Sequence, residues 1–190
     1  LERLPKYDDF CIIPSNTNYQ AVHDNCLNLY RPFIHTPATG DWGWSEKLMR
    51  HIFGEQYDLG LRYMQALFLE PDRMLPILVL VSRERQTGKT TFINWLSMIF
   101  GGNVAIINPE DLTGSFNSAY ATANIIAVEE TLLEKSMTIE KLKALATGKY
   151  LSVNQKFVQP YKVPFYGKII LSSNNEEKFV RIDQEEVRFF

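Results

Sequence analysis

A short polar segment, Thr87-Gly88-Lys89-Thr90, has the residue types and spacing of a phosphate-binding loop. In such a loop, backbone N–H groups and the N-terminus of the following helix bind phosphate oxygens. The lysine reaches the β- and γ-phosphates of a nucleoside triphosphate, and the Thr90 hydroxyl is placed to ligate Mg²⁺. We therefore predict that Thr87, Gly88, Lys89, Thr90 and Thr91 bind a nucleotide.

Polar residues also follow two other apolar segments that read as buried strands. Glu129 and Glu130 follow the segment 121–128, and Asn174 lies just after the segment 168–171. Because ligands bind beyond the carboxyl ends of parallel strands, we expect these side chains to face the same site as the loop. Glu129 would hold Mg²⁺, Glu130 would orient an attacking water, and Asn174 would bind that water or the γ-phosphate.

Each motif has a simpler interpretation when it is taken by itself. Gly-Lys-Thr can belong to a surface turn, and the full phosphate-loop pattern has a glycine where this chain has Arg83. A pair of glutamates can be a solvated strand end, and Ser-Ser-Asn-Asn can be an ordinary turn. The order of all three along one chain favours a nucleotide site.

The patterns around these motifs predict an α/β fold with a parallel sheet. The apolar segment before the loop suits a strand buried on both faces, and apolar residues at helical spacing after the loop predict a helix that ends at Gly101-Gly102. Further strands are predicted over 104–107, 121–128, 150–157, 163–165 and 168–171, with 150–157 and 163–165 forming a hairpin, and a helix is predicted over 138–146.

Residues 1–70 are predicted to form a small helical region ahead of a nucleotide-binding core at 71–190. Residues 1–14 read as irregular, and helices are expected over 19–30, 45–53 and 57–68. The three histidines of this region have no metal-ligand spacing, so we interpret them as ordinary surface or core residues.

Composition excludes several classes of protein. The chain of 190 residues is 45% hydrophobic and 22% charged, which is typical of a globular protein. Its formal net charge of −2 disfavours a surface that binds duplex DNA along its whole length, so nucleic-acid contacts should be local or created by assembly. Two cysteines and the lack of a membrane-length apolar run predict a cytoplasmic protein with no membrane contact. The missing initiator methionine suggests a piece of a longer protein.

The order of the motifs resembles that of the superfamily 3 helicases of the AAA+ class, and above all the primase–helicase proteins of phages, plasmids and mobile elements. The shared order is T-G-K-T, two glutamates after an apolar strand, a basic β-hairpin, an apolar strand followed by Ser-Ser-Asn, and an arginine. The resemblance runs from about residue 75 to the end of the chain. It implies a P-loop NTPase core of three layers.

This resemblance also implies a function and partners. The expected activity is ATP-dependent translocation on DNA and DNA unwinding during replication of a phage or mobile element, in a bacterial or phage-infected cytosol. The expected ligands are ATP with Mg²⁺, and the expected partners are single-stranded DNA and further copies of the chain in a hexameric ring. Lys89 and Thr90 match the phosphate and Mg²⁺ ligands, Glu129 and Glu130 the acidic strand-end motif, and Asn174 the asparagine of the third motif.

Arg188 lies where such proteins place an arginine finger, a residue that completes the nucleotide site of the neighbouring subunit. Arg181 is an alternative for this role. A local ion pair of Arg188 with Glu185 or Glu186 is a second alternative.

The segment 147–163 corresponds to a hairpin that faces the central channel of such rings and contacts single-stranded DNA. Lys156 is the first candidate for the DNA-binding lysine, with Lys149 and Lys162 as alternates, and Phe157 or Tyr161 could add an aromatic contact. Without the resemblance, Lys156 reads as an ordinary exposed strand lysine.

Two other functions fit a phosphate loop. A P-loop kinase of small molecules would need a second substrate pocket and a lid. A nucleotide-binding switch or assembly module without productive turnover would tolerate the change Glu130→Gln.

Overall fold

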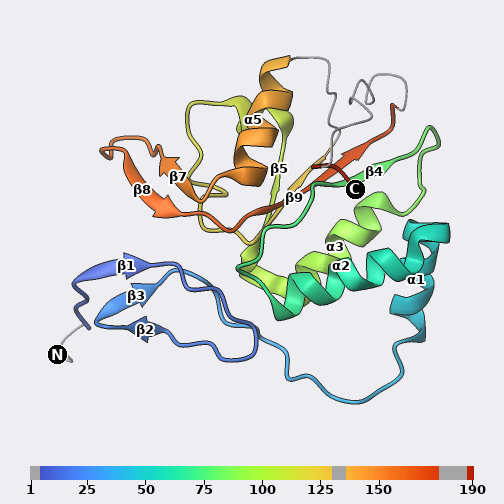
Figure 1. Cartoon of the computed structure of the whole chain (residues 1–190), viewed down its shortest axis with the longest axis horizontal. Coiled ribbons are helices and arrows are strands. Elements are labelled where there is room, and N and C mark those ends of the chain that lie inside the picture. Colours follow the sequence, from blue (N-terminus) through green and yellow to red (C-terminus); the bar gives the residue numbers. More distant parts are fainter. Residues whose placement is uncertain (1–4, 130–135, 176–187) are drawn as a thin grey trace.

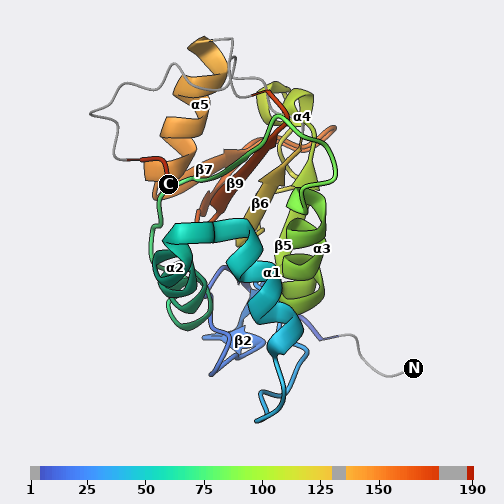
Figure 2. The same ribbon diagram turned by 90° about the vertical axis from the view of Figure 1, so that its right-hand side faces the viewer.

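A four-stranded parallel sheet forms the centre of the molecule (Figures 1 and 2). The computed structural model describes residues 5–129, 136–175 and 188–190. The strands lie side by side in the order β4 (Leu78–Val81), β9 (Lys168–Ser173), β6 (Ile125–Val128) and β5 (Val104–Ile107). All three pairings are parallel, so the carboxyl ends of these strands meet at one edge of the sheet. The prediction of an α/β fold with a parallel sheet is confirmed.

Helices cover both faces of this sheet because its central strands are apolar on both sides. In β6, Ile126 and Val128 pack toward α5 (Ser136–Thr147), whereas Ile125 packs toward the opposite face. In the view of Figure 1, α5 lies above the sheet, and α2 and α3 lie below it.

Three longer helices build the second face. They are α1 (Gly43–Phe53), α2 (Tyr57–Leu69) and α3 (Lys89–Phe100), with the short 3₁₀ helices η1 (Gly54–Gln56) between α1 and α2 and η2 (Gly101–Asn103) after α3. Phe53, Leu67 and Phe92 are buried where these helices pack together against the sheet. The predicted helices over 45–53, 57–68 and after the loop are confirmed, and α3 ends at Gly101 as expected.

The helix predicted over 19–30 is wrong. A small sheet occupies this part of the chain, with strands β1 (Asp9–Cys11), β2 (Val22–His23) and β3 (Cys26–Asn28) in the order β1–β3–β2. Asp24 and Asn25 connect β2 to β3 with φ angles of 47° and 61°. Positive φ at two successive residues makes a tight hairpin turn and ends any helix, and Asp and Asn tolerate it better than most residues.

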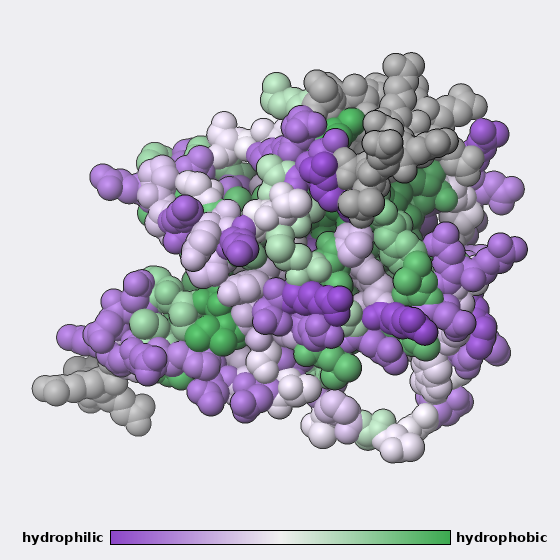
Figure 3. Space-filling model, in the orientation of Figure 1, coloured by the Kyte–Doolittle hydropathy of each residue, from purple (hydrophilic) through white to green (hydrophobic). Residues whose placement is uncertain are grey.

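The predicted basic hairpin is present, with a first strand shorter than the predicted 150–157 and a second strand that begins before the predicted 163–165. It consists of β7 (Tyr150–Val153) and β8 (Tyr161–Pro164), which pair antiparallel so that Ser152 lies opposite Lys162. In the space-filling view, the hairpin projects from the body of the molecule (Figure 3).

The last described residues lie beside the start of β4. Ile77 N donates a hydrogen bond to Arg188 O at 2.7 Å, and Phe190 N donates to Ile77 O at 2.7 Å. The end of the chain therefore runs along the edge of β4 that faces away from β9. Within the described residues, the structure has no helix that is long and apolar enough to cross a membrane.

Candidate functional site

The loop 82–88 connects the carboxyl end of β4 to the first residue of α3, Lys89. Gly88 precedes the helix with φ 85°, a left-handed conformation that side chains other than glycine rarely adopt. The first N–H groups of a helix have no acceptors within the helix, so the start of α3 can bind an anion.

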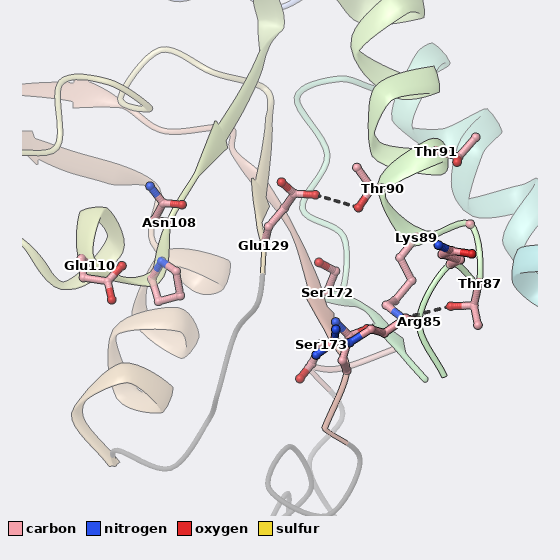
Figure 4. Close-up of a pocket in the computed structure, with 14 residues that line it drawn as sticks. Arg85, Thr87, Lys89, Thr90, Thr91, Asn108, Glu110, Glu129, Ser172 and Ser173 are labelled. Atoms are coloured by element: carbon pink, nitrogen blue, oxygen red, sulfur yellow. Dashed lines mark hydrogen bonds between the residues drawn. The ribbon is translucent and has the colours of Figure 1, made fainter. Parts of the chain in front are cut away.

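A pocket of about 880 Å³ lies at this point, between the loop and the carboxyl ends of the other three strands (Figure 4). It is lined by Arg85, Gln86, Thr87, Gly88, Lys89, Thr90, Thr91, Asn108, Pro109, Glu110, Glu129, Ser172, Ser173 and Asn174. The structure thus brings together the loop residues, Glu129 and Asn174, which the sequence predicts to share one site.

Two hydrogen bonds join side chains that line this pocket. Thr90 Oγ1, at the start of α3, donates a hydrogen bond of 3.1 Å to Glu129 Oε1, which follows β6. Lys89 Nζ donates to Thr87 Oγ1 at 3.0 Å. Partial burial lowers the pKa of Lys89 from its ordinary value. The Lys89 ammonium group and the N-terminus of α3 suit the binding of a phosphate group. The neighbouring oxygens of Thr90 and Glu129 suit the binding of a metal ion that accompanies it.

The end of β9 contributes both backbone and side-chain groups to the pocket region. Ser172 and Ser173 are both buried, and Asn174 follows them at the pocket. Ser173 O accepts a hydrogen bond from Ser82 N at 3.2 Å, and Ser173 Oγ accepts one from Asn175 N at 3.2 Å. Ser173 therefore ties the start of the loop to the turn that carries Asn174.

Sequence reasoning missed the contribution of β5 to the pocket. Asn108 follows β5 directly and opens the short helix α4 (Pro109–Thr113), which also carries Glu110. Asn108 lies close to Glu129 because β5 is the neighbour of β6, and Glu129 N donates to Ile107 O at 3.3 Å. The signal was available, since Asn108 is a polar residue that follows a predicted strand, as Glu129 is.

His51 contacts the loop from outside the pocket. Its Nε2 lies 3.1 Å from Thr87 O, and because a carbonyl oxygen only accepts, Nε2 carries the proton. The sequence interpretation of His51 as an ordinary residue overlooked this contact. This hydrogen bond brings α1 into contact with the loop.

The structure does not place every predicted catalytic residue at the pocket. Glu130 and Arg181 fall outside the described residues. Arg188 lies next to Ile77, at the amino end of β4, whereas the pocket lies at the carboxyl end of that strand. A residue expected to act on a neighbouring subunit does not have to face its own pocket.

The predicted DNA-binding lysines lie on the hairpin, away from the pocket (Figure 1). Lys156 is exposed at the tip, with Nζ 5.1 Å from the centre of the Phe157 ring. Lys162 Nζ lies 5.0 Å from the centre of the Tyr150 ring, and Lys149 precedes β7. Phe157 is 94% exposed and has φ 65°, an uncommon conformation for an aromatic residue.

A family model described as a family of unknown function, DUF5906, matches residues 80–188, which is more than half of the chain. The chain belongs to the DUF5906 family. The match contains the loop, all four strand ends and the hairpin. A search of curated proteins finds no match to this DUF5906 chain.

Solved structures of the NrS-1 C-terminal region resemble the DUF5906 chain. An apo structure of this region has a TM-score of 0.80 at 18% identity and covers 96% of this chain and 46% of its own. A second, the A form, has a TM-score of 0.77 at 19% identity with the same coverage, 96% and 46%. These likenesses show a shared fold, and the DUF5906 chain spans just under half the length of the NrS-1 structures.

Proposed function

We propose that the DUF5906 chain forms the P-loop ATPase core, of AAA+ type, of a superfamily 3-type DNA helicase. In this role it hydrolyses ATP to move along DNA and unwind it during replication of a phage or mobile element. The observation that carries the proposal is the 3.1 Å hydrogen bond between Thr90 and Glu129 in a pocket that also holds Lys89. Together with the start of α3, these side chains supply what phosphoryl transfer requires, a phosphate cradle and hard oxygen ligands.

The pocket residues fit an Mg²⁺ ion that arrives with ATP. Mg²⁺ is usually held by one or two side-chain oxygens together with phosphate oxygens and water. Thr90 Oγ1 and Glu129 Oε1 are 3.1 Å apart, so both can face the same ligand. When bound, the ion neutralises charge on the β- and γ-phosphates. Lys89 and the first N–H groups of α3 would hold the phosphates themselves.

Hydrolysis also needs an oriented water and a positive charge near the leaving group. Glu130 follows Glu129 directly and would orient the water, and Asn174 lines the pocket at the end of β9. Arg188 of a neighbouring copy would stabilise the charge that develops on the phosphates. This last role requires a ring, for which we propose a hexamer.

The hairpin would contact single-stranded DNA. An exposed lysine and an exposed aromatic ring at one tip provide phosphate binding and base stacking together. A ring would bring the hairpins of all its subunits into one channel. This explains how a chain with a net charge of −2 could bind DNA tightly without a basic surface of its own.

ATP turnover by the full-length protein, with and without single-stranded DNA, tests the proposal. The expected result is hydrolysis that DNA stimulates, abolished by Lys89→Ala, with the stimulated part abolished by Lys156→Ala while this variant still binds ATP. Turnover that requires Lys89 but responds to neither DNA nor Lys156→Ala would retain the nucleotide site and refute the helicase. ATP binding without turnover would favour a nucleotide-binding switch instead.

A further inference from the structure

One buried asparagine joins the hairpin to the segment that leads away from the pocket. Asn117 is 8% exposed and lies in the connection between α4 and β6. Its Oδ1 accepts a hydrogen bond from Asn154 N at 2.7 Å, and its Nδ2 donates to Ser152 O at 2.8 Å. Its backbone N donates to Asn154 O at 3.2 Å. Three hydrogen bonds thus fix Asn117 to the end of β7, directly before the tip that carries Lys156.

The same connection begins at the pocket. Asn108 and Glu110, which line the pocket, open α4. The helix is closed at both ends, because Asn108 N donates to Asp111 Oδ2 at 3.1 Å and Gly114 N donates to Glu110 O at 2.7 Å. These contacts hold the short helix together, and only Ser115 and Phe116 separate Gly114 from Asn117.

A second element holds the base of the hairpin from another direction. Ile12 packs in one apolar cluster with Ala121 and with Val153 and Val163, which lie on β7 and β8. Ile12 comes from the small N-terminal sheet region and is not among the residues that line the pocket. Within this cluster, Ala121 belongs to the connection that carries Asn117, whereas Ile12 supports the hairpin base from a segment outside that connection.

We propose that Asn117 is a positioning residue that couples the nucleotide pocket to the hairpin. A ligand in the pocket contacts Asn108 and Glu110, a shift of these residues moves α4, and Asn117 transfers that shift to Ser152 and Asn154. The hairpin tip then presents Lys156 and Phe157 differently in the nucleotide-bound and nucleotide-free states. This inference rests on the proposed function, and it assigns to that function the link between its two sites.

Linkage provides a test that does not depend on turnover, because coupled sites change each other's affinity by the same factor. The affinity of the full-length protein for a fluorescent single-stranded oligonucleotide is measured by anisotropy, with and without a non-hydrolysable ATP analogue. For the unaltered protein we expect the two dissociation constants to differ by at least about fivefold. For Asn117→Ala we expect this ratio to fall to within about twofold of one, while the affinity for the analogue alone stays within about threefold of its original value.

Three further variants make the result specific. Ser118→Ala changes an exposed neighbour in the same connection and should leave the ratio unchanged. Ile12→Ala loosens the hairpin base from its other support, and it should weaken DNA binding in both nucleotide states while keeping the ratio. Asn117→Asp keeps the acceptor for Asn154 N and loses the donor to Ser152 O, so it should give an intermediate ratio. If Asn117→Ala does not fold, Asn117→Asp replaces it in the measurement.

The outcomes separate this inference from the proposed function. An unchanged ratio in Asn117→Ala would overturn the inference, as would a loss of both affinities with the ratio preserved, which is the result of a purely structural role. If the unaltered protein binds both ligands with a ratio near one, the coupling fails and the two binding sites remain. If it binds neither ATP nor DNA, the proposed function fails and the coupling fails with it.

Discussion

The hydroxyl of Thr90, in the first turn of α3, donates a hydrogen bond of 3.1 Å to Oε1 of Glu129, the first residue after β6. The strands that lead to these two residues are not neighbours, because β9 lies between β4 and β6. The contact therefore depends on the correct order of three strands and on the loop that turns α3 back over the sheet.

The carboxylate of Glu129 should set the Mg²⁺ requirement of ATP turnover. Glu129→Gln keeps the shape of the side chain and removes its charge, so the Mg²⁺ concentration for half-maximal turnover should rise by at least about tenfold. Thr90→Ser, which keeps a hydroxyl, is the matched control and should shift this concentration little. An unchanged Mg²⁺ dependence in Glu129→Gln would contradict the assignment.

The contact between His51 and the loop should contribute to nucleotide affinity. His51→Ala removes a hydrogen bond to Thr87 O worth about 1 kcal/mol, so the dissociation constant for ATP should rise about fivefold. DNA affinity measured without nucleotide should not change, since the hairpin is remote from α1.

His35→Ala is the matched control for that measurement. His35 Nε2 lies 2.7 Å from Met98 O, so it makes the same type of contact at the other end of α3. If both variants weaken ATP binding equally, the effect of His51 belongs to the packing of α3 and not to the loop.

Lys168 should give the protein an unusual dependence of stability on pH. The side chain is buried at the start of β9, and its Nζ donates to Pro71 O and Tyr166 O. Burial lowers its pKa to about 7, although the nearby carboxylate of Asp72 acts in the opposite direction. Between this pKa and the unfolded value of 10.5 the unfolded chain binds more protons, so stability should increase as pH rises from 7.

Denaturant unfolding at pH 7 and pH 9 measures this effect. The free energy of unfolding of the unaltered protein should rise by about 2 kcal/mol relative to that of Lys168→Met over this interval. Asn124 Nδ2 also donates to Pro71 O and Tyr166 O, so these carbonyls keep a partner in the variant. Lys47→Met, at an exposed position, should show the same pH dependence as the unaltered protein. Parallel pH profiles for Lys168→Met and the unaltered protein would refute the prediction.

The site could be predicted from sequence where its residues follow local signals. Glu129 and Asn174 each come directly after a buried strand, and Lys89 follows another strand through the loop 82–88. The carboxyl ends of parallel strands meet at the same edge of the sheet whatever the order of the strands. Glu110 was missed because it lies three residues beyond the end of β5, and because only the adjacency of β5 and β6 places it near Glu129.

The rest of the fold depends on contacts between residues that are distant along the chain. Asn117 reads as a loop residue in the sequence, and its role comes from pairing with Ser152 and Asn154. The segment 19–30, which contains β2 and β3, is predicted as a helix because its apolar residues have helical spacing. The positive φ angles of Asp24 and Asn25 instead make it a hairpin. Helical periodicity over a short segment cannot reveal such a turn.

Phe157, at the tip of the hairpin, should lower the stability of the fold while it increases the affinity for DNA. Phe157 combines a left-handed backbone with a side chain that is 94% exposed, so neither packing nor local conformation favours an aromatic residue there. Asn tolerates this conformation better. Phe157→Asn should therefore keep or raise the free energy of unfolding, by up to about 1 kcal/mol, since it relieves backbone strain.

The same variant should lose base stacking, which contributes about 1–3 kcal/mol per base. Its affinity for single-stranded DNA should therefore fall by at least about fivefold. Val158→Ala, next to it and also exposed, serves as the control and should leave DNA affinity nearly unchanged. The slope of affinity against salt concentration distinguishes stacking from charge. Phe157→Asn should preserve this slope, whereas Lys156→Ala should reduce it, because only the lysine displaces counterions from the phosphates. Unchanged DNA affinity in Phe157→Asn would remove the ring from the binding surface and leave its strained, exposed position without a function.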